Sequence, residues 1–299
     1  MNRFWTSYIN PLIEAAAPAR IVEVGAEFGW NTEKLLGYCR AHRCALDVVD
    51  PMPHPALHQV LAKFPYEHRY HPLKSIDALP ILPPADLILL DGDHNWFTVY
   101  TELQLIFARA IECGATPPIV LMHDVAWPYA RRDMYYSPDS LAPAHRHPYA
   151  ARGIRPGIST LVDDGLNSTF HNAMGEGGPQ NGVLTAVEDF IAAWPHPIRF
   201  VRLPFHNGLG IVVPKARARP ELMSVIDGFF QPDALLATCE DLERTAMSVR
   251  AELAALRQKL IQQSEALIRA RARIVELEEE GEGQSPIRAS LSLTRRESR

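Results

Sequence analysis

The sequence has 299 residues, 47% of them hydrophobic and 22% charged, and a formal net charge of −5. This is ordinary globular composition, and the length allows one large domain with an appendage. The negative charge argues against nucleic acid as the main partner, because it offers no basic field for a phosphate backbone. The longest apolar runs are too short to cross a bilayer and no signal segment opens the chain, so we expect a cytoplasmic protein without a membrane span.

Between Arg20 and Asp124, short β-rich apolar runs alternate with helical patterns. The runs are IVEVG, LDVVD, ADLILLDGD and PIVLMHD, and helices are predicted over residues 32–40 and 97–111. Short buried strands that alternate with helices are typical of a parallel sheet with right-handed crossovers.

Two further β-like runs follow a predicted helix over residues 182–194. They span residues 198–204 and 209–214, and the Asn207-Gly208 pair between them predicts an antiparallel hairpin. We therefore expect an α/β domain over residues 1–215. Its fold would be Rossmann-like and doubly wound, with a mostly parallel seven-stranded sheet, an antiparallel terminal hairpin and an added C-terminal helix.

Residues 125–181 interrupt this pattern, because they show no sustained periodicity and are rich in Pro, Gly, His, Arg and Asn. A loop of this length inside a compact domain is typically a binding loop, a lid or a disordered segment, and we expect a substrate-covering insert. Its guanidinium and aromatic groups suit an anionic or sugar-bearing substrate, the alternative being a solvated loop. These groups are Arg131, Arg132, Tyr135, Tyr136, His145, Arg146, His147, Tyr149, Arg152 and Arg155.

Residues 232–280 carry a heptad pattern that predicts a coiled coil. The a positions are Cys239, Ala246, Leu253, Leu260, Leu267 and Ile274, and the d positions are Leu235, Leu242, Val249, Leu256, Gln263, Ala270 and Leu277. The coiled coil would join the chain to itself or to a partner protein, with stoichiometry and orientation left open. A single amphipathic helix folded onto the domain is the alternative, and the charged, Ser-rich tail over residues 281–299 is predicted to be disordered.

The turn after the first predicted strand has two glycines four residues apart, Gly25 and Gly29, which allow close approach to a ligand and tight entry into a helix. Glu27 stands where a dinucleotide-binding turn needs its second glycine, and its carboxylate would repel a pyrophosphate. S-adenosylmethionine has no phosphate; Glu23 would meet its ammonium group, and helix amides near Asn31 would accept its carboxylate. The cofactor-binding residues predicted in this segment are Glu23, Gly25, Ala26, Gly29 and Asn31.

Two later residues complete the predicted cofactor site. Asp50 ends the second strand, where an acid would bind both ribose hydroxyls; a turn residue before Pro51 is the alternative. Ser75 precedes the strand predicted at ADLILLDGD, in a loop that would flank the adenine. A helix N-cap explains a serine there equally well.

Ionisable residues follow the next two strands, as Asp91-Gly92-Asp93-His94 and His123-Asp124. Ligands bind outside the carboxyl ends of strands in open α/β sheets, so these residues should face the cofactor's methyl group. Carboxylates and imidazoles together suit either a hard divalent ion or proton abstraction from a hydroxyl. We expect Asp91 and Asp124 to be candidate Mg²⁺ ligands, Asp91 also to bind the cofactor, and His94, Asp93 and His123 to be catalytic. The alternatives are capping or turn roles for the two aspartates after the fourth strand and a packed imidazole for His123.

Together, VEVGAEFGWNT, the acid in VVDP, DLILLDGDHNWFTVYTEL and IVLMHD resemble the class I S-adenosylmethionine-dependent methyltransferases over about residues 18–215. Within that class, the DGDH motif and the helix after it resemble a group related to the macrocin-type sugar O-methyltransferases. The segment from PYARRDMYYSP to GGPQNGVLTAVEDFIA is similar to an insert in methyltransferases of bacterial surface-polysaccharide and glycosylation gene sets. The resemblance implies O-methylation of a sugar or glycosylated acceptor in polysaccharide or glycoconjugate biosynthesis.

The macrocin-type enzymes hold a divalent metal with aspartates at the ends of strands four and five, which correspond here to Asp91 and Asp124. This sequence has His123 where some members have a second aspartate, so His123 is left as a ligand, a base or neither.

Two other classes of function are consistent with parts of the sequence. One is a non-catalytic coiled-coil adaptor built on a degenerate methyltransferase fold, against which the intact Glu23, Gly25, Gly29 and Asp50 argue. The other is a nicotinamide-dependent oxidoreductase, against which Glu27 and the absent third glycine argue. Cofactor binding separates all three.

Overall fold

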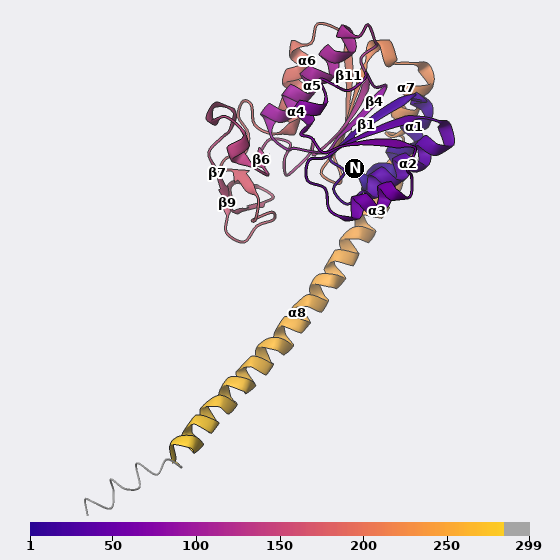
Figure 1. Cartoon of the computed structure of the whole chain (residues 1–299). Helices are drawn as coiled ribbons and strands as arrows, with labels where there is room; N and C mark the ends of the chain where they lie inside the picture. Colours follow the sequence, from indigo (N-terminus) through magenta and orange to yellow (C-terminus); the bar gives the residue numbers. More distant parts are fainter. Residues whose placement is uncertain (284–299) are drawn as a thin grey trace, which may run out of the picture. The chain divides into compact units, whose positions relative to one another are not determined.

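The computed structural model describes the backbone of residues 1–283 and the side chains through residue 280 (Figure 1). The chain divides into two compact units. The first spans Met1–Phe229, and the second begins at Phe230. The tail predicted to be disordered, residues 281–299, lies outside the described side chains.

The first unit is built on a seven-stranded sheet with the order β11-β12-β5-β4-β1-β2-β3. Its strands are β1 (Arg20–Val24), β2 (Ala45–Val49), β3 (His68–His71), β4 (Leu87–Leu90), β5 (Ile119–His123), β11 (Ile198–Leu203) and β12 (Leu209–Pro214). Every pairing from β5 to β3 is parallel, whereas β12 runs antiparallel to both β5 and β11. The predicted fold class, a Rossmann-like, mostly parallel sheet with an antiparallel terminal hairpin, is confirmed.

Helices cover both faces of the sheet, because its central strands are apolar on both sides. Along β4, Leu87 and Leu89 pack into one core, while Ile88 and Leu90 pack into the other. The first core lies under α1 (Asn10–Ala16), α2 (Trp30–His42), α3 (Ala56–Ala62) and α7 (Pro220–Gly228), and the second under α4 (Ser75–Ala78), α5 (Trp96–Glu112) and α6 (Val183–Ala193). This arrangement leaves the carboxyl ends of the parallel strands along one edge (Figure 1).

Short helical turns precede α1 and punctuate the loops. They are η1 (Asn2–Phe4), η2 (Trp5–Ile9), η3 (Pro138–Ser140), η4 (Pro143–His145) and η5 (Lys215–Arg217). Phe4 at the chain start is fully buried in the core under α1 and α2. The first residues of the chain therefore belong to the packed domain.

The segment after β5 contains strands that the sequence pattern did not reveal. They are β6 (Met134–Tyr135), β7 (Tyr149–Ala151), β8 (Gly153–Arg155), β9 (Ile158–Val162) and β10 (His171–Ala173), arranged as β6-β10-β7 and β8-β9. Asp133 joins both ends of this insert to α5: its Oδ1 accepts hydrogen bonds from the N–H groups of Trp96 and Gly182, each at 2.7 Å. Strands of two to five residues are too short to produce a visible alternation.

The second unit consists of α8 (Pro232–Gly283), a single helix of 52 residues. Its apolar side chains are largely exposed, as Leu256 and Leu260 illustrate at 61% and 63%. Within residues 1–283, none of the helices combines the length and apolar character that crossing a membrane requires.

Candidate active site

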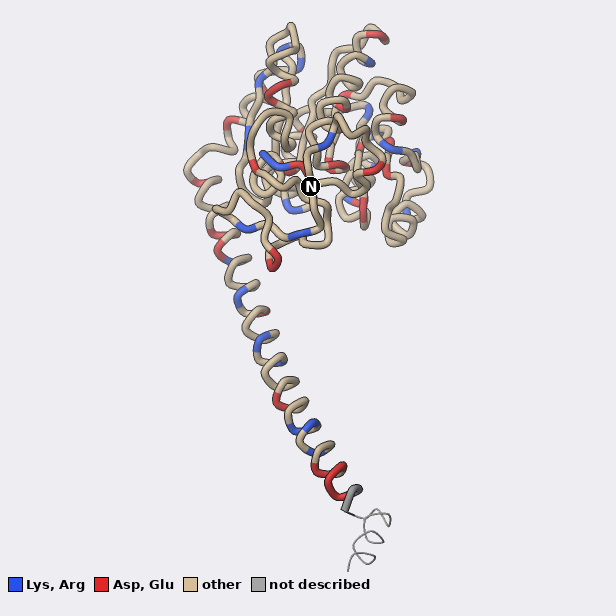
Figure 2. Tube along the Cα trace, turned by 90° about the vertical axis from the view of Figure 1, so that its left-hand side faces the viewer, with Lys and Arg blue, Asp and Glu red and all other residues tan. Residues whose placement is uncertain are grey.

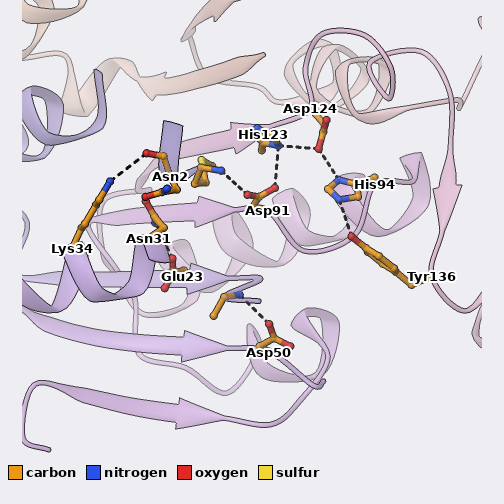
Figure 3. Close-up of polar contacts among 12 residues, drawn as sticks. Asn2, Glu23, Asn31, Lys34, Asp50, Asp91, His94, His123, Asp124 and Tyr136 are labelled. Atoms are coloured by element: carbon orange, nitrogen blue, oxygen red, sulfur yellow. Dashed lines mark hydrogen bonds and ion pairs between the residues drawn. The ribbon is translucent and has the colours of Figure 1, made fainter. Parts of the chain in front are cut away.

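Glu23 and Asn31 form a buried polar pair beside the end of β1. Glu23 is 2% exposed, and Asn31, in the first turn of α2, donates from Nδ2 to Glu23 Oε1 at 2.8 Å (Figure 3). Among the described residues, Glu23 Oε2 and Asn31 Oδ1 are buried without a hydrogen-bond partner. Burial raises the pKa of Glu23 to about 7. A cationic ligand group here would favour the carboxylate form and could donate to both open oxygens.

The turn after β1 packs directly on the end of β4. Gly25 has φ +83°, and a Cβ at this position would lie only 2.2 Å from the carbonyl oxygen of Asp91. Gly29, with φ +79°, is the N-cap of α2, where a Cβ would lie 3.0 Å from Leu57 Cδ1. Both positions therefore require glycine for conformation and for space.

Asp50, the residue after β2, holds the same turn from the other side. Its Oδ2 accepts hydrogen bonds from the N–H groups of Ala26 at 3.0 Å and Glu27 at 2.9 Å, and its Oδ1 accepts one from Met52 at 2.9 Å. The carboxylate therefore braces the glycine turn, a role that sequence reasoning missed. Its contact with ribose hydroxyls stays a prediction.

Helix α5 carries a further buried acid, Glu102, which the sequence analysis did not single out. Glu102 of α5 is 1% exposed, and among the described residues its Oε1 is buried without a hydrogen-bond partner. Ser75, the first residue of α4, lies near its carboxyl group and lowers its pKa. Burial raises the pKa of Glu102 to about 8, and the nearby Asp93 contributes to the shift. Ser75 does not cap α4, since Lys74 occupies the N-cap position. A signal was present in the sequence, because Glu102 stands three residues after Val99 on the apolar stripe of its helix.

Asp91, His123 and Asp124 converge where β4 and β5 end (Figure 3). His123 Nδ1 lies 3.1 Å from Asp91 Oδ1 and 2.9 Å from Asp124 Oδ2. One potential ligand atom from each residue falls within 4.8 Å of the others. Asp124 adopts φ +59°, a left-handed conformation that costs a non-glycine residue about 1 kcal/mol or more. Such strain is typical of functional positions.

The electrostatics of this cluster favour positive charge at its centre. Burial alone would lower the pKa of His123, but Asp91 and Asp124 outweigh it and raise the pKa to about 9. Burial would raise the pKa of Asp91, yet His123, the amino group of Met1 and His94 together hold it below its usual range. The two carboxylates thus stabilise the positive charge of His123.

His94 extends the cluster toward the insert. Its Nδ1 lies 3.2 Å from Asp124 Oδ2, its Nε2 lies 3.2 Å from the hydroxyl of Tyr136, and its ring stacks on Tyr129 at 5.6 Å. Burial and the surrounding carboxylates raise the pKa of Tyr136, so its hydroxyl stays protonated at neutral pH. Asp93 contacts the backbone of this group and not its side chains: its Oδ1 accepts a hydrogen bond from the N–H group of His94 at 3.1 Å, and its Oδ2 accepts one from Thr98 Oγ1 at 3.3 Å.

The N-terminal turn lies against the same edge. The amino nitrogen of Met1 is 2.7 Å from Asp91 Oδ2, and the ring of Phe4 lies edge-on to His123 at 6.0 Å. Lys34 of α2 donates to the carbonyl oxygen of Asn2 at 3.4 Å. These residues therefore adjoin Asp91 and His123, and sequence reasoning did not include them.

The insert's arginines do not point into this site as free cations. Each is bound to acidic side chains or backbone carbonyl oxygens, through the pairs Arg131–Glu188, Arg132–Ala173, Arg146–Asp139, Arg152–Asp163 and Arg155–Asp164. His145 stacks on Phe97 at 3.9 Å, and His147 contacts the carbonyl of Gln180. That these groups bind an anionic or sugar-bearing substrate therefore stays a prediction. The insert's contribution to the site is aromatic, through Tyr129 and Tyr136.

Neither the protein-family models nor the curated proteins include a match to this chain. Solved structures of methyltransferases resemble it at low sequence identity. The S-adenosylhomocysteine-bound methyltransferase PaMTH1 of Podospora anserina is 17% identical, with a TM-score of 0.43 over 69% of this chain and 76% of that chain. The 1,6-didemethyltoxoflavin-N1-methyltransferase of Burkholderia thailandensis, solved with its substrate and S-adenosylhomocysteine, is 13% identical, with a TM-score of 0.39 over 69% and 78%. The fold assignment rests on the strand order and directions given above.

Proposed function

We propose that this chain is an S-adenosylmethionine-dependent O-methyltransferase. The observation that carries the proposal is the grouping of polar residues at one sheet edge: the Glu23–Asn31 pair, the turn braced by Asp50, and the Asp91–His123–Asp124 cluster. These groups lie at the carboxyl ends of β1, β2, β4 and β5, which are neighbouring strands of the sheet. Ligands of open α/β sheets bind at such an edge.

The cofactor's amino-acid end fits the buried pair. Glu23 Oε2 and Asn31 Oδ1 are acceptors without a partner, and an ammonium group is a donor that satisfies both. Glu27 stands within the glycine turn at φ +49°, where a dinucleotide-binding turn has a glycine so that a pyrophosphate can approach. These acceptor groups support a cationic, phosphate-free cofactor. Bound S-adenosylmethionine would supply an electrophilic methyl group.

The Asp91–His123–Asp124 cluster also fits a divalent cation. Two carboxylates and an imidazole are suitable ligands, and their atoms lie close enough together to contact one ion. Mg²⁺ held by Asp91 and Asp124, with His123 as a third ligand, would lower the pKa of an acceptor hydroxyl.

His94 is placed to accept the hydroxyl's proton. The carboxylate of Asp124 only accepts hydrogen bonds, so the proton of a neutral His94 ring resides on Nδ1 and leaves Nε2 as the base. Tyr136 donates to Nε2 at 3.2 Å, and an acceptor hydroxyl would replace it as donor. In the methyl transfer that bound S-adenosylmethionine would supply, Nε2 of His94 would take the proton of the acceptor hydroxyl and so free the acceptor oxygen to bond the methyl carbon.

We propose a sugar or glycosylated molecule as the acceptor, within polysaccharide or glycoconjugate biosynthesis. The aromatic groups beside His94 support this class, because the apolar faces of sugar rings stack on aromatic side chains. Tyr136 lies 5.6 Å from Phe170 and Tyr129 lies 5.6 Å from His94, ring centre to ring centre. The polar cluster on the other side suits a hydroxyl.

Calorimetric titration with S-adenosylhomocysteine tests the cofactor proposal. We expect the wild type to bind and Asp50→Ala to bind at least about tenfold more weakly, because the turn loses its brace. Asp163→Ala, an exposed acid of the insert, is the matched control and should bind as the wild type does. No binding by the wild type, with or without Mg²⁺, would overturn the proposal in favour of the non-catalytic adaptor.

A further inference from the structure

Helix α8 presents an apolar stripe that none of the described residues of its own unit covers. It is helical without interruption from Pro232 to Gly283, so the heptad positions from Leu235 to Leu277 lie on one continuous helix. Leu253, Leu260 and Leu267, at successive a positions, are between 46% and 63% exposed. An isolated helix with such a stripe gains stability only by burying it against another helix.

The polar residue in the stripe distinguishes the two ways of pairing α8 with a second copy. Gln263 occupies a d position. In a parallel, in-register pair, it meets the second copy's Gln263, and the two amides hydrogen-bond to each other. In an end-to-end antiparallel pair, Gln263 would face Leu253, and its buried amide would lack a partner.

The flanking charges favour the same arrangement. Figure 2 shows charged residues of both signs along α8. In the parallel register, Glu252 at g faces the second copy's Arg257 at e, an attractive contact. Arg273 and Glu278 form the same type of pair three heptads later.

The antiparallel arrangement sets like charges against each other. At the centre of an end-to-end antiparallel pair, Lys259 would face its own counterpart, and so would Arg257. Facing like charges destabilise a pairing, and the parallel register has none at its e and g positions.

We propose that α8 pairs with the α8 of a second copy of this chain as a parallel, in-register, two-stranded coiled coil. The occupant of the stripe is therefore the same helix, aligned residue for residue. This inference is independent of the proposed methyltransferase activity, because it uses only residues of α8.

Mass measurement by light scattering tests self-association, with a matched pair of variants of the full chain. The wild type should have twice the 33.5 kDa mass of one chain. Leu260→Lys/Leu267→Lys, at a positions, should raise the dissociation constant about a hundredfold or more, since lysines would enter the interface. Ile261→Lys/Ile268→Lys introduces the same charges at b, outside the interface, and should leave the mass doubled. A wild-type mass of one chain, or equal effects of the two variants, would overturn the proposal.

Cross-linking through Cys239 tests whether the two copies of α8 run parallel. Cys239 is exposed and occupies an a position, so a parallel register places it opposite its own counterpart, within disulfide range. Mild oxidation of Cys113→Ser, which removes the other exposed cysteine, should yield a covalent dimer. Cys113→Ser/Cys239→Ser/Arg244→Cys carries its cysteine at the outward f position and should not cross-link. If Cys113→Ser fails to cross-link while Cys113→Ser/Leu277→Cys does so through Cys239, the pairing is antiparallel and the proposal fails.

A charge exchange tests the register itself. Glu252→Arg should weaken the dimer, because it places two arginines opposite each other. Adding Arg257→Glu to the same chain restores an opposite-charge contact in the parallel register and should restore the affinity. No recovery in the double variant would contradict the proposed alignment.

Discussion

Nδ1 of His94 lies 3.2 Å from Oδ2 of Asp124, although the two residues follow different strands of the sheet. The carboxylate fixes the tautomer of the imidazole and leaves Nε2 facing the hydroxyl of Tyr136. An imidazole held in this way is prepared to accept a proton at a defined atom. The proposed chemistry depends on this pair.

Replacing the proposed base should separate catalysis from binding. We expect His94→Gln to lower kcat about 100-fold or more while S-adenosylhomocysteine binds with an unchanged Kd, because the cofactor pair at Glu23 is untouched. Tyr136→Phe removes one hydroxyl and should lower kcat less than His94→Gln does. Single-turnover kinetics together with calorimetry make the comparison. Equal loss of cofactor binding and kcat in His94→Gln would contradict the assignment of His94 as base.

Removing divalent ions should lower activity, because the Asp91–His123–Asp124 cluster is the proposed ion site. Treatment with a chelator is expected to reduce the rate at least about tenfold, and added Mg²⁺ should restore it. Asp91→Asn should weaken Mn²⁺ binding, measured by calorimetry, about tenfold or more, since it removes a ligand charge. Asp93→Asn, outside the cluster, is the control and should bind Mn²⁺ as the wild type does. Activity that survives chelation unchanged would show that proton transfer needs only side chains.

The contact between Gly25 and β4 should be intolerant of a methyl group. Gly25→Ala would place its Cβ 2.2 Å from the carbonyl oxygen of Asp91, in a left-handed conformation. We expect a loss of about 2 kcal/mol or more in the free energy of unfolding and weaker S-adenosylhomocysteine binding. Gly37→Ala lies inside α2 with nothing within 4 Å of the added Cβ, so it should stabilise the protein by about 0.5–1 kcal/mol. Urea unfolding of both variants provides the measurement.

Glu102 should make stability depend on pH in a predictable direction. Its pKa is about 8 in the folded chain against 4.5 for the unperturbed group, so the unfolded state releases its proton first as pH rises. The free energy of unfolding therefore falls by a few kcal/mol as the pH rises from 4.5 to about 8, in proportion to the shift in the pKa of Glu102. Glu102→Gln should lack this loss and be the more stable protein at pH 8. Glu112→Gln, exposed on the same helix, should titrate like the wild type in urea unfolding measured at pH 5 and pH 8.

The fold was largely predictable because its signals are local. Four buried runs end in polar residues, and the Asn207-Gly208 turn joins two apolar strands, so strand type and hairpin direction followed from burial and turn chemistry. The short β3 and the small strands of the insert were missed, since His68–His71 and Met134–Tyr135 are too short or too polar for a periodic pattern. The candidate site was predictable to the same extent: residues at strand ends were expected to meet, and Asp91, His94, His123 and Asp124 do.

What the sequence determined by itself were the strands of the central sheet other than β3, the residues at their carboxyl ends and the long helix α8, because each depends on near neighbours in the chain. Only the tertiary structure decided which atoms pair. Asn31 bonds Glu23, Asp50 braces the turn at Ala26, and Asp133 ties the insert to α5. Buried polar side chains need hydrogen-bond partners. Which partner each one meets depends on how separate segments of the chain pack against each other.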